Sequence, residues 1–205
     1  MVKTRRASGQ IRYEVTVPTS NDLTFTGTGP TVSNVVAGMH LNCHFQLAHI
    51  AKQARNAVYR PKRFPACILR LRDPKATALV FEGGRVQVLG TKSIADARLA
   101  GRKFGRMLQK MGYQPHMTDF AVQNMVANAD TKMLIRLEGL QARCWHFTRW
   151  DPEIFPGLIF YLMKPKMTML IFARGKMVFL GARSREEIDE ALRLVWPLLL
   201  EFKRE

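Results

Sequence analysis

The sequence predicts an α+β fold: one curved antiparallel sheet made of two repeated halves, with two long helices on its convex face. The main observation is a duplication. Phe64 and Phe81, each in an apolar segment beside cations, recur as Phe155 and Phe172. The offset of about 91 residues is too long for a solenoid period and indicates a duplicated half-domain. The second observation is that strands and helices recur in the same order in both halves, and the 47% hydrophobic content is ample for a shared core.

The composition also suggests where the halves begin. The first thirty or so residues are rich in Thr, Ser and Gly, which predicts a flexible N-terminal extension over 1–30. The first repeat is then expected over 31–115 and the second over 116–205.

The first repeat opens with a buried strand near 34–41, followed by a short helix that ends near Asn56. Strands are expected at 66–72, 78–81 and 85–89, separated by the turn signals Asp73-Pro74-Lys75 and Gly83-Gly84. Ser93 is a predicted N-cap for a long helix that Gly112 ends.

The second repeat follows the same order. A strand is expected over 121–127, a short helix over 142–147 and three strands between 158 and 180. Ser184 with Glu187 forms a predicted capping box for the last long helix. With both long helices on the convex face, the concave face is left open and needs something to fill it.

The charge balance favours a polyanionic partner. Lys and Arg number 32 against 16 Asp and Glu, which gives a net charge of +16 and a pI near 10.4. Nucleic acid is the first candidate and an anionic membrane surface the second. No segment approaches the roughly 20 apolar residues of a membrane span. The first residues lack the apolar stretch of a secretory signal, so we expect an intracellular protein.

An enzyme, metal or cofactor site is not expected. Cys43, Cys67 and Cys144 are widely spaced without a Cys-x-x-Cys pair, and we interpret them as buried small residues. Asp151 and Glu153 flank a proline on a predicted exposed turn, where nothing would raise a carboxyl pKa for catalysis. We therefore predict no catalytic residue, no metal ligand, no cofactor and no small-molecule substrate.

The repeated aromatic residues carry the main functional prediction. Taken singly, each of Phe64, Phe81, Phe155 and Phe172 would more often be a core residue than an exposed wedge. As pairs at equivalent hairpins of a twofold sheet, flanked by cations, they suit a protein that wedges base steps apart in a minor groove. Cations on strand ends and hairpins would hold the phosphates: Arg63, Arg70, Arg85, Lys92, Lys176 and Arg183.

Several segments closely resemble the core domain of the TATA-box-binding protein family, in order over roughly residues 30–205. They include Asn34-Val35-Val36-Ala37, Pro61-Lys62-Arg63-Phe64, Gln123-Asn124-Met125-Val126 and Phe155-Pro156-Gly157-Leu158-Ile159. The resemblance implies a pseudo-twofold saddle whose concave sheet binds the DNA minor groove, and this family is itself a known example of a binder that kinks DNA.

The resemblance also implies roles for individual residues. The four phenylalanines correspond to the wedge pairs, and Asn34 and Asn124 to the central hydrogen-bonding pair. The remaining groove contacts implied are Val36, Val126, Leu79, Leu170, Val178, Pro65 and Pro156.

Four positions depart from the family pattern. Leu89 and Leu180 stand at groove positions where threonine is usual, Gln87 where valine is usual, and Tyr161 where arginine is usual. The lost hydroxyls predict that DNA bending is kept better than strict TATA preference, because minor-groove readout is already degenerate.

The resemblance places partner surfaces as well. Asp151, Glu153 and Ile154 match the acidic turn that the family offers to transcription factor IIB. The basic face of the first long helix would meet a IIA-like factor, a second nucleic-acid strand or solvent alone: Arg98, Arg102, Lys103, Arg106 and Lys110.

The expected function is therefore that of a nuclear general transcription factor that bends promoter DNA and nucleates initiation-complex assembly. Two alternatives remain: a family paralogue with relaxed specificity, and a fragment of a DNA-repair enzyme with a similar sheet. The second would need a catalytic Lys or Asp in a helix–hairpin–helix segment, which we do not find.

Overall fold

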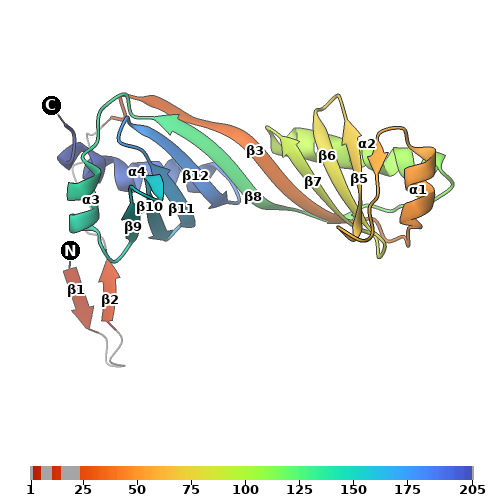
Figure 1. Ribbon diagram of the computed structural model, residues 1–205, viewed down its shortest axis with the longest axis horizontal. Helices are drawn as coiled ribbons and strands as arrows, with labels where there is room; N and C mark the ends of the chain where they lie inside the picture. The colour runs from red at the N-terminus through yellow and green to blue at the C-terminus, as the bar shows by residue number, and fades with distance from the viewer. Residues whose placement is uncertain (1, 6–10, 15–23, 205) are drawn as a thin grey trace. The chain divides into compact units, whose positions relative to one another are not determined.

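A computed structural model describes residues 2–5, 11–14 and 24–204, with side chains from residue 24 onward (Figure 1). The chain divides into two compact units. The N-half unit is Val32–Val126, and the C-half unit is the chain from Ala127 onward together with the described residues up to Thr31.

The N-half unit contains most of the elements predicted for the first repeat. Its strands β3 and β8 continue into the C-half unit. In chain order its elements are β3 (Thr28–His40), α1 (Leu47–Gln53), β4 (Ala57–Val58), β5 (Ala66–Leu71), β6 (Ala76–Phe81), β7 (Arg85–Thr91), α2 (Ile94–Lys110) and β8 (Thr118–Asp130).

The C-half unit repeats this order. Its elements are α3 (Leu137–Arg143), β9 (Thr148–Asp151), β10 (Phe155–Met163), β11 (Lys166–Ile171), β12 (Lys176–Ala182) and α4 (Arg185–Glu201). The main sheet has the strand order β4-β5-β6-β7-β3-β8-β12-β11-β10-β9, and β1 (Val2–Arg5) pairs separately with β2 (Ile11–Glu14). The predicted antiparallel α+β fold with two repeated halves is confirmed.

Burial alternates along each strand, as expected when only one face of a sheet is covered. In β6, Ala76, Ala78 and Val80 are buried, whereas the side chains between them are half-exposed. Helix α2 contacts β6 and β7 and buries small residues such as Ala97 and Ala100 against them, which lets helix and sheet approach closely. β11 alternates in the same way, and α4 contacts β12.

The long helices begin where the sequence predicts. Ser93 Oγ accepts a hydrogen bond of 3.0 Å from the Asp96 amide at the start of α2. Ser184 Oγ accepts one of 3.3 Å from the Glu187 amide at the start of α4, and Glu187 in turn accepts one from the Arg183 amide. These caps satisfy amides that have no partner within the helix.

The strand registers show the duplication at the level of single residues. Leu79 pairs with Gln87 between β6 and β7, and Leu170 pairs with Val178 between β11 and β12. One step further, Thr77 pairs with Leu89, and Thr168 pairs with Leu180. Each position on one hairpin therefore has a structural counterpart on the other.

Three features differ from the prediction. The second short helix is α3 at Leu137–Arg143 rather than 142–147, because Leu137 and Leu140 are its buried pair, as Leu47 and Ile50 are in α1. Strands β4 and β9 were not predicted, since two- and four-residue strands are too short to show a clear period.

The third difference concerns the predicted flexible extension at 1–30. Its last residues belong to β3, which begins at Thr28. Just before the strand, the ring of Phe25 meets that of Trp196 edge to face, with centroids 4.7 Å apart. The contact forms because an aromatic residue in an otherwise polar segment packs against a side chain of α4. Residues 1, 6–10 and 15–23 of the predicted extension lie outside the described residues.

Among the described helices, none combines the length and the apolar content needed to cross a membrane.

Candidate nucleic-acid interface

Each unit leaves one face of its sheet without a covering helix, and we call these the open faces. On the N-half unit, the half-exposed positions of β6 and β7 lie opposite the side chains that α2 buries. The open face of the N-half unit carries Asn34, Val36, Ile68, Thr77, Leu79, Phe81, Gln87 and Leu89, and that of the C-half unit carries Ile159, Thr168, Leu170, Phe172, Val178 and Leu180.

The first predicted wedge pair lies on the open face of the N-half unit. Phe64 and Phe81 meet edge to face, with ring centroids 6.2 Å apart at an angle of 61°. Phe64 is 39% exposed and Phe81 is half-buried. The Arg85 guanidinium lies over the Phe81 ring, 4.5 Å from its centroid, which places a cation beside the pair.

The second pair repeats this arrangement in the C-half unit. Phe155 and Phe172 have centroids 5.9 Å apart and an angle of 66°, and both rings are half-buried. Gly157 lies close to both rings, since a Cβ there would be 2.7 Å from Cε1 of Phe155 and 3.0 Å from Cε1 of Phe172. Two aromatic rings thus stand together at the same point of both repeats.

Core phenylalanines are clearly different from these four. Phe45, Phe104, Phe160 and Phe179 are fully buried. The four predicted wedge residues instead keep part of each ring exposed, on a sheet face that no helix covers. The prolines that follow the first ring of each pair, Pro65 and Pro156, are both exposed.

Asn34 is held in a defined orientation by a β-bulge. The register between β3 and β7 shifts between Val35 and Ala37, and Gly90 adopts a φ of 89° at this point. The Gly90 amide donates a hydrogen bond of 2.9 Å to Asn34 Oδ1. Because the side-chain oxygen is engaged, the Asn34 amide group presents its two N–H donors, and acceptors are what every base pair shows in the minor groove.

The other predicted groove contacts are also on or beside these faces. Val36, Leu79 and Leu89 are half-exposed in the N-half unit, as are Asn124 and Val126 of β8. Leu170, Val178 and Leu180 are half-exposed in the C-half unit. Leu89 and Leu180 each pair with a threonine of the neighbouring strand, so the hydroxyl missing at the leucine is present one strand away.

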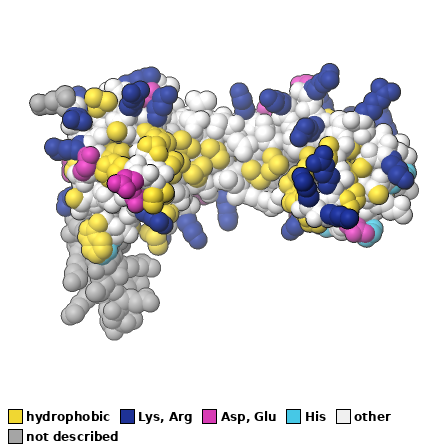
Figure 2. Space-filling model, in the orientation of Figure 1, with side chains coloured by type: hydrophobic (Ala, Val, Ile, Leu, Met, Phe, Trp, Pro, Cys, Tyr) yellow, Lys and Arg dark blue, Asp and Glu magenta, His cyan; other side chains and the backbone are white. Residues whose placement is uncertain are grey.

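Cations border the open faces. Figure 2 shows Lys and Arg side chains beside hydrophobic side chains on the visible face, with fewer acidic side chains among them. Arg70 pairs with Thr77, whereas its counterpart Tyr161 pairs with Thr168, so one repeat lacks the cation that the other has. All of the predicted phosphate contacts are exposed: Arg63, Arg70, Arg85, Lys92, Lys176 and Arg183.

The predicted acidic turn connects β9 to β10. Asp151 Oδ1 accepts a hydrogen bond of 3.2 Å from the Glu153 amide, and the Asp151 carbonyl accepts one of 3.1 Å from the Ile154 amide. Ile154 is 78% exposed. A hydrogen-bonded turn therefore presents two carboxylates and an apolar side chain to solvent.

The basic side of α2 is partly engaged within its own unit. Lys103 Nζ lies 3.2 Å from a carboxylate oxygen of Asp73 and donates to the Asp73 carbonyl. The Arg98 guanidinium lies 4.3 Å from the centroid of the Phe120 ring. Arg102, Arg106 and Lys110 are exposed.

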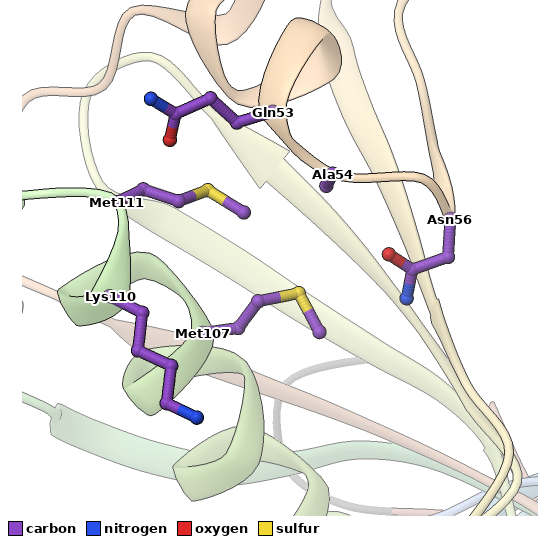
Figure 3. A pocket seen from close by; sticks show the side chains of 6 residues that line it. All are labelled: Gln53, Ala54, Asn56, Met107, Lys110 and Met111. Carbon is purple, nitrogen blue, oxygen red and sulfur yellow. The ribbon is translucent and has the colours of Figure 1, made fainter.

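The N-half unit also contains a cavity of about 500 Å³ between the ends of α1 and α2 (Figure 3). Met107, Lys110 and Met111 line it from α2 and its end, and Gln53, Ala54 and Asn56 from the end of α1. It lies on the helix side of the sheet and is not part of the open face.

Burial raises the pKa of the Cys67 thiol to about 11, so this cysteine is a protonated core residue at neutral pH.

Sequence reasoning missed Gln123, which hydrogen-bonds to Gln87 on the N-half unit. It also missed the role of Gly157 beneath the second ring pair. Both positions could have been noticed as differences between the two repeats. Gln87 corresponds to Val178, and Gly157 corresponds to Ala66.

Comparison with known proteins agrees with this geometry. The family described as transcription factor TFIID, or TATA-binding protein, matches residues 29–111 and again 119–202. The TATA-box-binding proteins of Emericella nidulans and Schizosaccharomyces pombe are each 49% identical over 178 residues, and these cover 87% of this chain. The match spans 66% of the first relative and 77% of the second.

A solved structure gives the same result. The TBP of Methanococcus jannaschii superposes with a TM-score of 0.76 at 33% identity, covering 84% of this chain and 98% of that one. The two family matches coincide with the two halves of the duplication. The chain therefore belongs to the TATA-binding-protein family of general transcription factors.

Proposed function

We propose that this chain binds promoter DNA through the minor groove and bends it by inserting two pairs of phenylalanine rings. The observation that carries the proposal is the recurrence of a partly exposed aromatic pair, Phe64 with Phe81 and Phe155 with Phe172, on the open face of each unit. Apolar rings that stand on an otherwise uncovered sheet suit insertion between base steps.

The remaining residues have complementary roles in this proposal. Asn34 and Asn124 donate to base acceptors, and the apolar side chains of the open faces contact base edges and sugars. The two repeats, over 31–115 and 116–205, each bring one ring pair. Exposed cations contact phosphates and hold the register: Arg63, Arg70, Arg85, Lys92, Lys176 and Arg183.

The protein acts, in this proposal, as a platform in the nucleus and catalyses no reaction. The turn of Asp151, Glu153 and Ile154 would bind a IIB-like initiation factor, which its exposed carboxylates and apolar tip support. The exposed cations of α2, Arg102, Arg106 and Lys110, would bind an acidic IIA-like factor. Arg98 and Lys103 would contribute less to binding this factor, because each already contacts a residue of its own unit.

A bending assay over a salt series tests the proposal. The full chain is added to a TATA duplex and to a scrambled duplex, each labelled with a donor and an acceptor dye at its ends. We expect energy transfer to rise on the TATA duplex and affinity to fall linearly with the logarithm of salt concentration. Each phosphate contact should contribute about 0.9 to that slope. Binding without any change in end-to-end distance would contradict insertion.

A second candidate function is DNA bending with relaxed sequence choice, and it is favoured by one observation. Leu89 and Leu180 present apolar side chains beside Thr77 and Thr168 on the open faces. Equal affinity for TATA and G·C-rich duplexes, with bending on both, would favour this reading over a strict TATA reader.

A further inference from the structure

The two open faces differ at one pair of equivalent positions. Leu79 pairs with Gln87 in the N-half unit, and Leu170 pairs with Val178 in the C-half unit. Gln87 also pairs with Gly38 on the neighbouring strand β3. An amide therefore occupies, in one repeat, a position that is apolar in the other.

Gln87 belongs to a group of three residues that depend on one another. Its Nε2 donates a hydrogen bond of 3.2 Å to Oε1 of Gln123. A Cβ on Gly38 would lie 2.3 Å from Nε2 of Gln123 and 2.9 Å from its Cδ. The absence of a side chain at Gly38 thus leaves the space in which Gln123 reaches Gln87.

This amide pair changes what the N-half open face can bind. A glutamine amide has both donors and an acceptor, and the bond to Gln123 engages a donor of Gln87, so Oε1 of Gln87 is available to accept. Gln87 is half-exposed and Gln123 is exposed, so both amides are at the surface. A valine at this position offers neither donor nor acceptor.

The minor groove distinguishes its base pairs by one donor. A·T and T·A present only acceptors there, whereas G·C adds the N2 amino group of guanine. An apolar surface pressed against that amino group would bury a donor without a partner, at a cost of about tenfold or more in affinity. An acceptor at the same place removes that cost.

We propose, on the basis of the minor-groove function above, that the Gln87–Gln123 amide pair is a specificity determinant. It accepts a hydrogen bond from the amino group of guanine. The N-half unit then tolerates a G·C pair at the base step that faces Gln87. The C-half unit, with Val178 at the equivalent position, requires A·T there. An element with a G·C pair in one half only is bound in a single preferred orientation.

Three duplexes separate this proposal from general loss of specificity. The first is a palindromic element of A·T pairs alone, the second carries one G·C pair, and the third carries G·C at that position and at its mirror position. The G·C position is moved stepwise across the half-site, and the dissociation constant of the full chain is measured by fluorescence anisotropy. At one position we expect the single G·C pair to weaken binding by no more than about threefold. On a palindromic element the protein can bind in the orientation that places Gln87 at the G·C pair. The double G·C should weaken it by about tenfold more.

Two variants assign the effect to its residues. Gln87→Val should make binding to the single G·C duplex about tenfold weaker relative to the A·T duplex. Gln123→Ala should weaken the single G·C duplex in the same way, because Gln87 loses the amide to which it hydrogen-bonds. Gln109→Val, at an exposed position of α2, is the matched control and should change none of the three. Thermal unfolding of each variant checks that its fold is intact.

The outcomes are distinct from failure of the proposed function. If the wild-type chain does not bind or bend the A·T duplex, minor-groove binding itself fails. If it binds and bends that duplex, equal losses for Gln87→Val and wild type on the single G·C duplex would overturn the amide assignment. An unchanged affinity of Gln123→Ala for the single G·C duplex would overturn the role of the amide pair as well.

Discussion

Phe155 and Phe172 lie edge to face with ring centroids 5.9 Å apart, on a face of the sheet that no helix covers. The same relationship holds at 6.2 Å for Phe64 and Phe81 in the other repeat. Edge-to-face rings stabilise each other by about 0.5–1.5 kcal/mol beyond their buried area, which keeps a half-exposed pair ordered before it meets a ligand. The two rings of a pair therefore hold each other in place and are not two independent surface residues.

The first prediction concerns this pair. The double change Phe155→Ala and Phe172→Ala should strongly reduce DNA bending, because the rings that unstack one end of the element are gone and only Phe64 and Phe81 remain. The free energy of unfolding should fall by only about 1–3 kcal/mol, since both rings are half-exposed. Energy transfer across a labelled duplex and thermal unfolding measure the two effects.

The matched control for the ring pair is Phe160→Ala. Phe160 is fully buried, so its truncation should cost about 3–5 kcal/mol in stability. A large stability loss in the double variant, with little loss of bending, would show instead that Phe155 and Phe172 are core residues.

The second prediction concerns sequence preference. Leu89→Thr with Leu180→Thr should increase the affinity ratio between a TATA duplex and a G·C-rich duplex by about tenfold, because each hydroxyl adds a hydrogen bond to base acceptors. Competition binding at fixed salt measures the ratio. Leu99→Thr, at an exposed leucine of α2, should leave the ratio unchanged. An unchanged ratio in the double variant would place sequence choice elsewhere.

The third prediction concerns the hairpin glycines. Gly84 has a φ of 88°, and a Cβ there would lie 2.7 Å from the Cys43 carbonyl oxygen. Gly84→Ala should therefore lower the free energy of unfolding by about 2–3 kcal/mol. Gly175, its counterpart with a φ of 85° and a Cβ position 2.4 Å from the Met133 carbonyl oxygen, should behave alike.

Gly83→Ala is the control for this strain. A Cβ at Gly83 would meet no atom within 4 Å, and alanine there should change stability by no more than about 0.5 kcal/mol. Chemical denaturation measures all three variants. Equal effects at Gly83 and Gly84 would contradict the conformational explanation.

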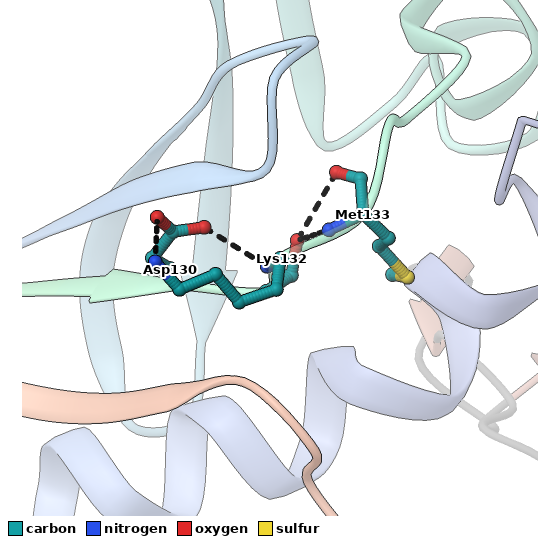
Figure 4. A network of polar contacts seen from close by, with 4 residues as sticks. Asp130, Lys132 and Met133 are labelled. Carbon is teal, nitrogen blue, oxygen red and sulfur yellow. Dashed lines mark hydrogen bonds and ion pairs between the residues drawn. The ribbon is translucent and has the colours of Figure 1, made fainter.

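The fourth prediction concerns acid stability. Asp130 accepts hydrogen bonds from the Lys132 amide at 2.9 Å and from its ammonium group at 3.1 Å (Figure 4). The hydrogen bond from the Lys132 backbone amide, followed by the one from the Lys132 ammonium group, lowers the pKa of Asp130. A depressed folded-state pKa contributes stability above the unfolded pKa of about 3.9, and this is lost as the pH falls through the folded value.

Asp130→Asn should therefore be less stable than the wild-type chain at pH 7, and the difference should shrink below about pH 4. Urea unfolding at pH 7, 5 and 3 measures it. A difference that stays constant across this range would show that the charge of Asp130 does not contribute.

Local patterns were sufficient for much of this architecture. The recurrence of Phe64 and Phe81 predicted the duplication, and Ser93 and Ser184 predicted where both long helices begin. Period-two apolar residues predicted the hairpins of each half. These features depend on a few adjacent residues, because helix caps, turns and one-sided burial all act over short distances along the chain.

Features that depend on contacts between distant segments could not be predicted. The shift of α3 to Leu137–Arg143 follows from which leucines reach the core, and two patterns five residues apart look equally helical. The β3 residues that begin at Thr28 looked like part of a polar extension, because a strand is recognised there only through its neighbours.

The sequence by itself determined that this is a duplicated, strongly basic family member with two aromatic pairs. Only the tertiary structure decided that those rings lie on an uncovered face, that Gly90 fixes the orientation of Asn34, and that Gln123 reaches Gln87. The physical reason is register. Which side chains meet across a sheet depends on bulges and strand pairing between segments far apart in the chain, and a linear pattern of hydrophobic residues carries no record of that pairing.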